Sequence, residues 1–563
     1  MRGAHSPPPA HRCSRRARPR HRAGRTPRPA HQVGLLVALA GILLIVTVTG
    51  GGIWAQMDDQ TSGGPVTVAS AELAPAPTGV TTDDGGCAGT NQSTNVSLSW
   101  TDGQSATADA SGGSLVTGYT VGRSSSSAGS YVAAGSVAGN PAPTTYTDTP
   151  TVAGTPVGLV ANTGKKIYPV SESALSAGAA VTIGTTSDEA NAIQITPDGL
   201  SAVVAEYGSN QVQVLTWSGS AWAIAKTLAV TGPTAVAIDP VATGAGTFVA
   251  YVVSDPGSTV DGSLVPVSVN GASSSLGTSI AIGEQANPTA VVVTPNGAMV
   301  FVANFNSNTV SAVSTATSTV TNVALPGTTA EPIALATTFD SSHVYVADRA
   351  NSYIDDISVA TTSVSAYIVL ATGALDDTVL TTSGNPNVMA MLPSGVALYV
   401  AEFGSSQVQV VDTALSGTPD TLGTSISTGS GSEPIDLASS PNGCLIYVAD
   451  WPSNDIFSIA TSTDTEATVF VTTCQTQDPQ PFQVTPDNQY LVIPENYSCG
   501  DLEFLDTATD AVTTARGVGS VPVMIAFPPI PIWYTTTATH ALWNSSPSTP
   551  TSYPAGWDPG GWQ

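Results

Sequence analysis

Short runs of alternating apolar and polar residues fill the chain from about residue 75 to residue 527. Gly, Pro, Asn, Asp and Ser separate these runs, and alternation with such breaks is typical of short, half-buried β-strands. From residue 156 onward the runs recur in groups of four, with a period of about 45 residues that is typical of propeller blades. A lone four-stranded unit cannot bury both faces, whereas a ring of them can. We therefore expect an all-β fold built around a β-propeller.

The repeated unit has two recognisable segments. One reads VAEYGSNQVQV at residues 204–214 and VAEFGSSQVQVV at residues 400–411. The other, upstream of it, contains a Thr-Pro-Asp-Gly or Thr-Pro-Asn-Gly turn, as at residues 196–199 and 294–297. In such a turn Gly supplies the positive φ angle and the Asp or Asn side chain bonds the nearby backbone. The first segment is then the second strand of a blade, its turn and its third strand.

Two stretches carry a family resemblance. TPNGAMVFVANFNSNTVSAVSTAT at residues 294–317 and SPNGCLIYVADWPSNDIFSIATST at residues 440–463 resemble the repeat of the YVTN family of bacterial and archaeal propeller proteins. The resemblance covers about two thirds of the chain and implies a propeller over residues 156–527. The shared letters are structural, so the resemblance implies no particular activity.

The repeat count favours eight blades. The first unit, residues 156–184, lacks its own inner strand, and PVMIAF at residues 522–527 lacks the strands that should follow it. Joining the two would close a ring of eight by pairing the ends of the propeller. In the alternative, residues 155–172 complete the preceding domain and seven blades remain.

A smaller domain precedes the propeller. Residues 74–152 hold five alternating runs, with Trp100 closing the second and Tyr119 in the third. Their order resembles a fibronectin type III domain of bacterial surface proteins, which implies a β-sandwich that serves as a spacer or adhesion module. We expect Trp100 in its core. Such a sandwich would still lack its last two strands, and in the alternative it extends to residue 175.

The N-terminus combines a basic segment with an apolar one. Residues 1–32 hold nine of the 15 Lys and Arg, and residues 33–55 carry no charge. About 20 apolar residues suffice to span a bilayer, and basic flanks stay in the cytoplasm. We therefore expect a single transmembrane helix with a cytoplasmic N-terminus and an extracellular body; the alternative is a cleaved signal peptide and a secreted protein. Residues 56–73 read as a linker and residues 528–563 as a flexible tail rich in Pro and Trp.

Beyond the apolar segment the chain is strongly acidic. Six Lys and Arg remain there against 41 Asp and Glu, a net charge of −35. A body of this charge repels nucleic acid, so we expect no nucleic-acid partner.

A polar residue recurs after the Val-Ala of each repeat, at the expected end of each second strand. In a propeller these positions form a ring on one face: Asn162, Glu206, Asp255, Asn304, Asp348, Glu402, Asp450 and Glu495. Aromatic residues follow five of them: Tyr207, Phe305, Phe403, Trp451 and Tyr497. One interpretation is a negative rim that binds a cation or a basic ligand, with aromatics that suit sugars. The favoured interpretation is structural, with each polar side chain accepting hydrogen bonds from the turn that follows.

Catalytic signals are weak. Only His343 and His540 follow the apolar segment, and no G-x-S-x-G or H-E-x-x-H motif occurs. Some related propellers are lyases that use histidine and glutamate with a metal, and this chain lacks those histidines. We expect no catalytic residue, no metal and no cofactor. A disulfide between Cys474 and Cys499 would link adjacent blades, while Cys444 would pair with Cys87 or stay free.

Together these features predict a surface-anchored, extracytoplasmic binding or adhesion protein that is not an enzyme. Its propeller would be the platform, and its partner an unknown protein or a cell-wall glycan. The alternatives are a propeller enzyme of the lyase or hydrolase type and a structural component of the cell envelope.

Overall fold

The computed structural model describes most of the propeller and a few strands outside it. Before residue 157 and after residue 528 it describes only the strands whose bounds are given below. Residues 157–528 are described except at 172–173, 185–189, 245, 258–260, 284–286, 328, 339, 370–385, 394, 414–419, 452–454, 472–480, 496–500, 517 and 519–521. The chain divides into two units, Met1–Leu73 and Ala74–Gln563, and each is described by itself.

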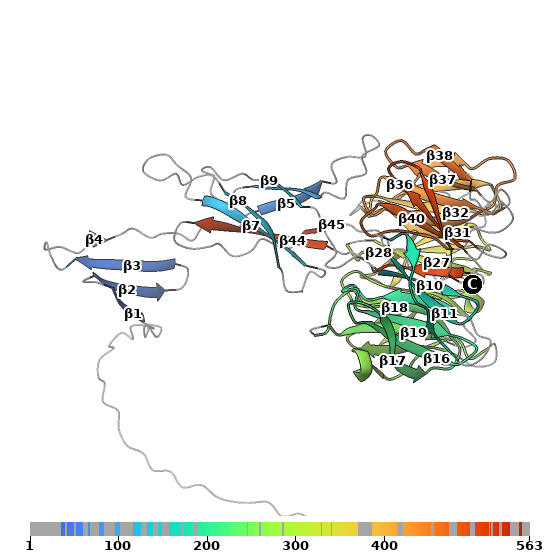
Figure 1. Ribbon diagram of the computed structural model, residues 1–563, viewed down its shortest axis with the longest axis horizontal. Helices are drawn as coiled ribbons and strands as arrows, with labels where there is room; N and C mark the ends of the chain where they lie inside the picture. Colours follow the sequence, from blue (N-terminus) through green and yellow to red (C-terminus); the bar gives the residue numbers. More distant parts are fainter. Residues whose placement is uncertain are drawn as a thin grey trace, which may run out of the picture. The chain divides into compact units, whose positions relative to one another are not determined.

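Eight antiparallel sheets form a β-propeller, which Figure 1 shows in colours from green to red. The blades, numbered along the chain, contain these strands: blade 1, β10 (Val157–Asn162), β11 (Lys166–Ser171), β12 (Ser176–Ala177), β13 (Val181–Thr182) and β43 (Pro522–Ala526); blade 2, β14 (Ala192–Ile195), β15 (Ser201–Glu206), β16 (Gln211–Trp217) and β17 (Trp222–Ala229); blade 3, β18 (Pro233–Ile238), β19 (Phe248–Ser254), β20 (Gly262–Val269), β21 (Ser275–Leu276) and β22 (Ile280–Gly283); blade 4, β23 (Pro288–Val293), β24 (Met299–Asn304), β25 (Thr309–Ser314) and β26 (Val320–Ala324); blade 5, β27 (Pro332–Thr337), β28 (His343–Asp348), β29 (Tyr353–Ser358) and β30 (Ser363–Val369); blade 6, β31 (Pro386–Met391), β32 (Ala397–Glu402), β33 (Gln407–Asp412) and β34 (Thr421–Ser427); blade 7, β35 (Pro434–Ser439), β36 (Leu445–Asp450), β37 (Asp455–Ala460) and β38 (Thr465–Val471); blade 8, β39 (Gln483–Val484), β40 (Tyr490–Pro494), β41 (Asp501–Asp506) and β42 (Val512–Arg516). The expected count of eight is confirmed.

The two ends of the propeller close the ring within blade 1. Strand β43 pairs with β10, with Leu159 opposite Ala526 and Val160 opposite Ile525. Residues 157–171 therefore belong to the propeller, and the alternative in which they complete the preceding domain is wrong. The pairing covers the inner edge of β10, because β43 supplies the first strand of blade 1.

The hydrophobic core lies between the blades. The first strands of neighbouring blades contact one another, as β23 does β27. Between blades 4 and 5, for example, Phe301 and Val310 pack with Val344 and Val346, all fully buried. Because alternate residues of a strand point to opposite faces, each blade contributes to two such interfaces.

The turn between first and second strands follows the sequence prediction. In blade 2 the Thr196 hydroxyl donates to Asp198 Oδ1 over 2.6 Å, and the Leu200 N–H donates to the same oxygen over 3.0 Å. Gly199 has a φ of 69°, and Gly297 of blade 4 has the same value. Glycine adopts this left-handed conformation without the steric cost that a Cβ brings.

Two further sheets lie outside the propeller. Strands β5 (Thr78–Asp83), β6 (Val96–Thr101) and β9 (Thr145–Asp148) form one in the order β5-β6-β9. The other has the order β45-β44-β7-β8, formed by β7 (Val116–Ser124), β8 (Val132–Ala138), β44 (Ile532–His540) and β45 (Thr551–Tyr553). Strand β44 pairs with β7, with Ala538 opposite Tyr119, and the two lie side by side in Figure 1.

This pairing differs from the flexible tail expected at residues 528–563. Local sequence could not reveal it, because β7 and β44 come from opposite ends of the chain. Tyr119 and Val121 of β7 are buried. Trp100 lies in β6, but the surroundings of its side chain are outside the described residues, so its core position stays a prediction.

The stretch expected to be a membrane helix is built of strands. Strands β1 (Leu35–Leu39), β2 (Ile42–Thr49), β3 (Gly52–Asp59) and β4 (Val66–Thr67) form one antiparallel sheet in chain order. Within the described part of the chain, none of the helices has the length and apolar character needed to cross a membrane. The helices described are two short 3₁₀ turns, η1 (Gly271–Ser273) and η2 (Phe305–Ser307). Residues such as Val46, Thr47 and Val48 are β-branched and favour strands.

Candidate functional site: the ends of the second strands

The recurring polar residues occupy equivalent places in the blades. Asn162, Glu206, Asn304, Asp348, Glu402 and Asp450 are each the last residue of a second strand, and Asp255 and Glu495 directly follow one. The structure thus places them in the predicted ring of positions. Seven of the eight are buried, however, and only Asp255 is half-buried. They do not form an exposed negative rim.

In blades 2 and 6 the glutamate is bonded to the turn that follows it. Glu206 Oε2 accepts hydrogen bonds from Ser209 Oγ over 2.8 Å and from Gln211 Nε2 over 3.0 Å. Glu402 Oε2 accepts equivalent bonds from Ser405 and Gln407, both over 2.5 Å. Burial raises the pKa of Glu402, and these two bonds act against that rise because they favour the charged form.

In blades 5 and 7 the aspartate holds the segment that enters its own blade. Asp348 Oδ1 accepts the N–H of Glu331 over 3.0 Å, and Asp450 Oδ1 accepts the N–H of Glu433 over 2.7 Å. Asp348 also accepts a 2.6 Å bond from Asn351 Nδ2. Burial raises the pKa of Asp348 in spite of these bonds.

The remaining positions are bonded locally as well, with one exception. Asn162 Oδ1 accepts from the N–H of Gly164 over 3.0 Å, Asp255 Oδ1 accepts from the N–H of Gly257 over 3.0 Å, and Asn304 Nδ2 donates to Ser311 Oγ over 2.8 Å. Glu495 is the exception, since neither of its buried carboxylate oxygens has a hydrogen-bond partner. These contacts support the structural interpretation of the ring in most blades.

The aromatic residues beside the ring are more accessible. The side chains of Tyr207 and Trp451 are 41% and 44% exposed, whereas Phe305 and Phe403 are half-buried. Tyr497 lies outside the described residues. The aromatics and carboxylates therefore do not form one binding rim as expected, because Tyr207 and Trp451 are exposed while seven of the eight polar residues are buried.

Phe305 is part of a contact between two blades. The Arg349 guanidinium of blade 5 lies 5.3 Å from the centre of the Phe305 ring of blade 4, within cation–π range. Arg349 also donates two hydrogen bonds to Glu331 Oε2, over 2.9 and 3.1 Å. The pair Arg349–Glu331 is partly exposed, so solvent weakens it. Phe305 thus takes part in the packing of blade 4 against blade 5.

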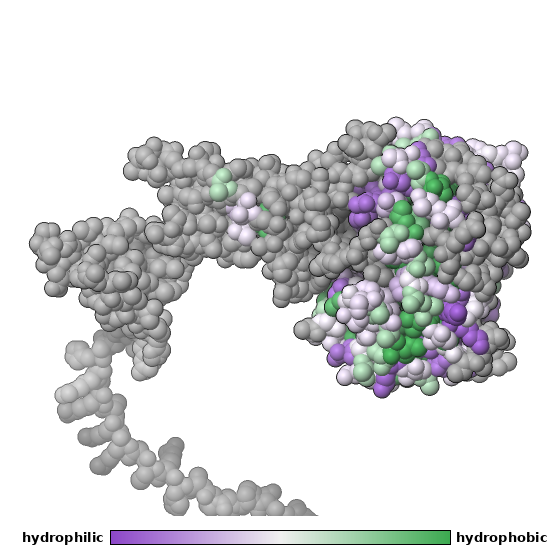
Figure 2. Space-filling model, in the orientation of Figure 1, coloured by the Kyte–Doolittle hydropathy of each residue, from purple (hydrophilic) through white to green (hydrophobic). Residues whose placement is uncertain are grey.

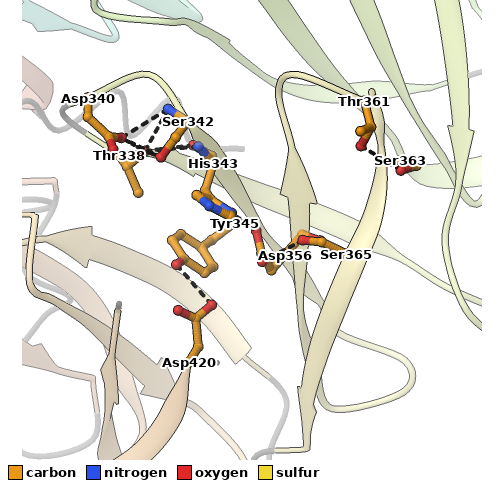
Figure 3. Close-up of polar contacts among 10 residues, drawn as sticks. All are labelled: Thr338, Asp340, Ser342, His343, Tyr345, Asp356, Thr361, Ser363, Ser365 and Asp420. Carbon is orange, nitrogen blue, oxygen red and sulfur yellow. Dashed lines mark hydrogen bonds and ion pairs between the residues drawn. The ribbon is translucent and has the colours of Figure 1, made fainter. Parts of the chain in front are cut away.

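A second polar cluster occupies the other end of strand β28. His343 Nδ1 lies 2.7 Å from Asp356 Oδ1, and Ser365 Oγ donates to Asp356 Oδ2 over 2.6 Å, so Asp356 bridges the two (Figure 3). Nearby, the Tyr345 hydroxyl donates to Asp420 of blade 6 over 3.0 Å. His343 was expected as a candidate from its rarity in the sequence, whereas Asp356 was not; its signal in the sequence is the pair of adjacent acids in the third strand of blade 5.

This cluster has an acid and a base but no activated nucleophile among its described members. Ser342 Oγ donates to Asp340 Oδ1 over 2.6 Å instead of to His343. Hydrogen bonds from Ser342 and Thr338 outweigh burial and lower the pKa of Asp340. Within the described residues, no group of three or more His, Cys, Asp and Glu side chains is placed to hold a metal ion.

Tyrosines of the second strands link neighbouring blades. Besides Tyr345, the Tyr399 hydroxyl of blade 6 donates to Asp464 Oδ1 of blade 7 over 2.5 Å. Burial and the neighbouring carboxylates raise the pKa of both tyrosines, so they remain neutral donors.

Of the five cysteines, the structure describes Cys444, which is disulfide-bonded and therefore not free. Cys474 and Cys499 lie outside the described residues, so their pairing stays a prediction.

Comparison with known proteins identifies the fold alone. No protein-family model matches the chain, and no curated protein matches it. Among solved structures, the dihydro-heme d1 dehydrogenase NirN is 14% identical over 65% of this chain and 73% of NirN, with a TM-score of 0.50. A protein from Lactobacillus plantarum is 16% identical over 56% of this chain and 94% of its own, with a TM-score of 0.44. Hydrazine synthase from Kuenenia stuttgartiensis is 14% identical over 58% and 95%, with a TM-score of 0.41. At these identities the likeness shows a β-propeller and says nothing of chemistry.

Proposed function

We propose that this chain is an extracytoplasmic surface protein whose propeller, of the YVTN type, binds a protein or a cell-wall glycan without catalysing a reaction. The apolar N-terminal segment, residues 33–55, would hold it in the cell membrane, with the N-terminus in the cytoplasm. The observation that carries the binding role is the exposure of Tyr207 and Trp451 at the ends of second strands whose acids are buried.

Exposed aromatic rings at these positions are better stabilised by contact with a ligand than by contact with water. A tyrosine or tryptophan ring offers a broad apolar face together with one polar group, which matches the faces of sugar rings and of protein side chains. Both residues directly follow a buried carboxylate that fixes the local backbone, Glu206 and Asp450. The acids therefore support the proposed surface by positioning its backbone.

The net charge of the chain and the distribution of apolar residues on its surface limit the class of ligand. The net charge of −35 beyond the apolar segment disfavours nucleic acid and favours neutral or basic partners. On the side visible in Figure 2, hydrophobic residues occupy a narrow band bordered by hydrophilic ones. Narrow apolar contact areas of this kind suit a glycan or a small protein epitope.

The strands outside the propeller support a spacer role for the second domain. The sheets β5-β6-β9 and β45-β44-β7-β8 together hold seven strands, the number of a fibronectin type III-like sandwich. Strands β44 and β45 would be the two that residues 74–152 lack, and Tyr534 in β44 would be the tyrosine usual in the sixth strand. The propeller would then be an insertion in that sandwich.

A paired substitution tests the binding surface. In the full chain, Tyr207→Ala with Trp451→Ala should lower retention on a glycan array or in a pull-down at least tenfold, because it removes the proposed contacts. The matched control is Leu200→Ala with Val396→Ala. These two apolar residues directly precede second strands and are 51% and 49% exposed. Equal retention by both pairs would contradict the proposed surface.

A second candidate function rests on the His343–Asp356 contact. A carboxylate at Nδ1 orients an imidazole so that Nε2 can act as a base, which favours an enzyme of the lyase or hydrolase type. Under that proposal, His343→Ala would abolish turnover of an uncharged or basic sugar-derived substrate, while Asp340→Asn would leave it intact. Absence of turnover in the unmodified chain over a panel of such substrates would remove this candidate.

A further inference from the structure

Glu495 is a buried acid between blades 7 and 8. The residue is 1% exposed, and within the described part of the chain neither carboxylate oxygen has a hydrogen-bond partner. Alternation along β40 places it on the same face as Leu491 and Ile493, which pack against Tyr447 and Ala449 of blade 7. The carboxyl group therefore lies in an apolar interface instead of at the surface.

Three acids, Asp501, Glu503 and Asp436, face Glu495, and the base Arg516 stands opposite Asp501 in the sheet. Ile493 pairs with Glu503, and the Glu495 N–H donates to the Asp501 carbonyl, so Asp501 and Glu503 share its face of the sheet. From blade 7, Asp436 faces the same interface, and its carboxylate accepts the N–H groups of Leu437 and Phe482 over 2.9 and 3.1 Å.

The strands that form this interface contain few bases. Strands β35 to β41 contain no Lys or Arg, and in β42 of blade 8 Arg516 stands opposite Asp501. An unpaired buried carboxylate is far costlier than a buried neutral acid, so the group keeps its proton instead. Burial, then the charges of Glu503 and Asp501, raise the pKa of Glu495 to about 8.

Blade 5 repeats the arrangement. Asp355 is fully buried, and both of its carboxylate oxygens lack a hydrogen-bond partner. It faces the interface with blade 4, where Asp348 is its acidic neighbour. The nearby base, Arg349, is bonded to Glu331 and stacked on Phe305. Burial raises the pKa of Asp355 well above its usual value.

We propose that the propeller is a proton-dependent assembly: Glu495 and Asp355 are neutral when the blades are closed, and loss of the Glu495 proton above neutral pH loosens the interface between blades 7 and 8. The domain is thereby matched to acidic surroundings, where it is most stable. This inference does not depend on the ligand or on the membrane anchor.

The direction of the pH effect follows from linkage. A glutamic acid loses its proton near pH 4.5 in the unfolded chain, whereas buried Glu495 keeps it to about pH 8. Its contribution to stability is therefore complete below pH 4.5 and is lost as the pH rises to about 8. In that window one such group changes the folding equilibrium by up to about tenfold per pH unit. Ordinary carboxylates are fully ionised by about pH 6 and do not contribute to a change between pH 6 and pH 9. Histidine and the terminal amine also titrate in that window, so the Glu495→Gln variant is needed to separate Glu495 from them.

Hydrogen exchange of the full chain, read by mass spectrometry and corrected for the intrinsic pH dependence, tests the proposal. Protection of peptides from blade 8 should fall at least about tenfold between pH 6 and pH 9. Peptides from blade 2, where Glu206 is bonded, are the internal reference and should stay within about threefold. Glu495→Gln should remove the pH dependence in blade 8, and Asp340→Asn, which removes an acid whose pKa is lowered, should leave it as in the unmodified chain.

A second measurement covers the case in which Glu495→Gln does not fold. Infrared spectra of the unmodified chain should show a protonated carboxyl band at pH 6.5 that decreases with a midpoint near pH 8. Absence of that titrating band overturns the proposal, as does pH-independent protection of blade 8 in the unmodified chain. A pH-dependent loss that persists unchanged in folded Glu495→Gln also overturns it.

Discussion

Blades 6 and 8 carry a glutamate at the same repeat position, yet the two side chains have opposite surroundings. Glu402 receives hydrogen bonds from Ser405 and Gln407, whereas Glu495 receives none and lies in an apolar interface. In blade 6 the turn reads Phe-Gly-Ser-Ser and the donor Gln407 follows it, opposite Glu402. In blade 8 the turn reads Asn-Tyr-Ser-Cys-Gly and Asp501, whose side chain is an acid, follows it. The repeat therefore fixes where a residue lies. Its neighbours decide whether its carboxylate is held by hydrogen bonds from the following turn, here called a structural joint, or is unpaired and titrates at a raised pH.

Removing the bonded glutamate should have the largest effect on stability. Glu402→Ala leaves two donors without an acceptor and opens a cavity in a fully buried place, so we expect a loss of about 2–4 kcal/mol in the free energy of unfolding. Urea denaturation at pH 7 measures it. The control is Glu466→Ala, an exposed glutamate in β38, which should change the same quantity by less than about 0.5 kcal/mol. Equal losses would show that Glu402 is not a joint.

Removing a donor should make blade 6 behave like blade 8. Gln407→Leu takes one of the two bonds from Glu402, so the pKa of Glu402 should rise further and stability should fall by about 1–3 kcal/mol at pH 7. Because a raised carboxyl pKa is a cost only above the unfolded pKa, the loss should be smaller at pH 4 than at pH 7. Denaturation at both pH values checks this, and a loss independent of pH would contradict it.

The link between blades 6 and 7 should contribute less. Tyr399→Phe keeps the ring and removes only the hydrogen bond to Asp464, so we expect a loss of about 0.5–1.5 kcal/mol. Thermal unfolding measures this loss, with Tyr251→Phe, in the second strand of blade 3, as the comparison. If the Tyr399 variant proved as stable as the unmodified chain, the bond would not hold the two blades together.

The repetitive part of the fold was predictable because it is local. The Thr-Pro-Asp-Gly turn at Thr196 to Gly199, the eight units and the closure by residues 522–527 all follow from periodicity and turn chemistry. The pairing of β44 with β7 was not predictable, since no local sequence pattern near Ile532 or Val116 indicates which strand pairs with which.

The candidate site was predictable in position but not in character. The positions of Glu206 and Glu402 followed from the repeat, and so did their favoured role as turn acceptors. The exposure of Trp451 depends on how blades pack, and the contact of His343 with Asp356 depends on strand register. Neither the exposure of Trp451 nor the His343–Asp356 contact can be predicted from one segment of the sequence alone.

The central claim is that the repeated acids are joints and that the exposed aromatics form the binding surface. Its most direct test compares two double variants of the full chain, Glu206→Gln with Glu402→Gln and Tyr207→Ala with Trp451→Ala, by glycan or protein binding and by thermal unfolding. The account predicts that the glutamine pair loses stability and keeps ligand binding below its unfolding temperature, while the alanine pair keeps stability and loses binding. Lost binding in a stable glutamine pair, with normal binding in the alanine pair, would contradict it.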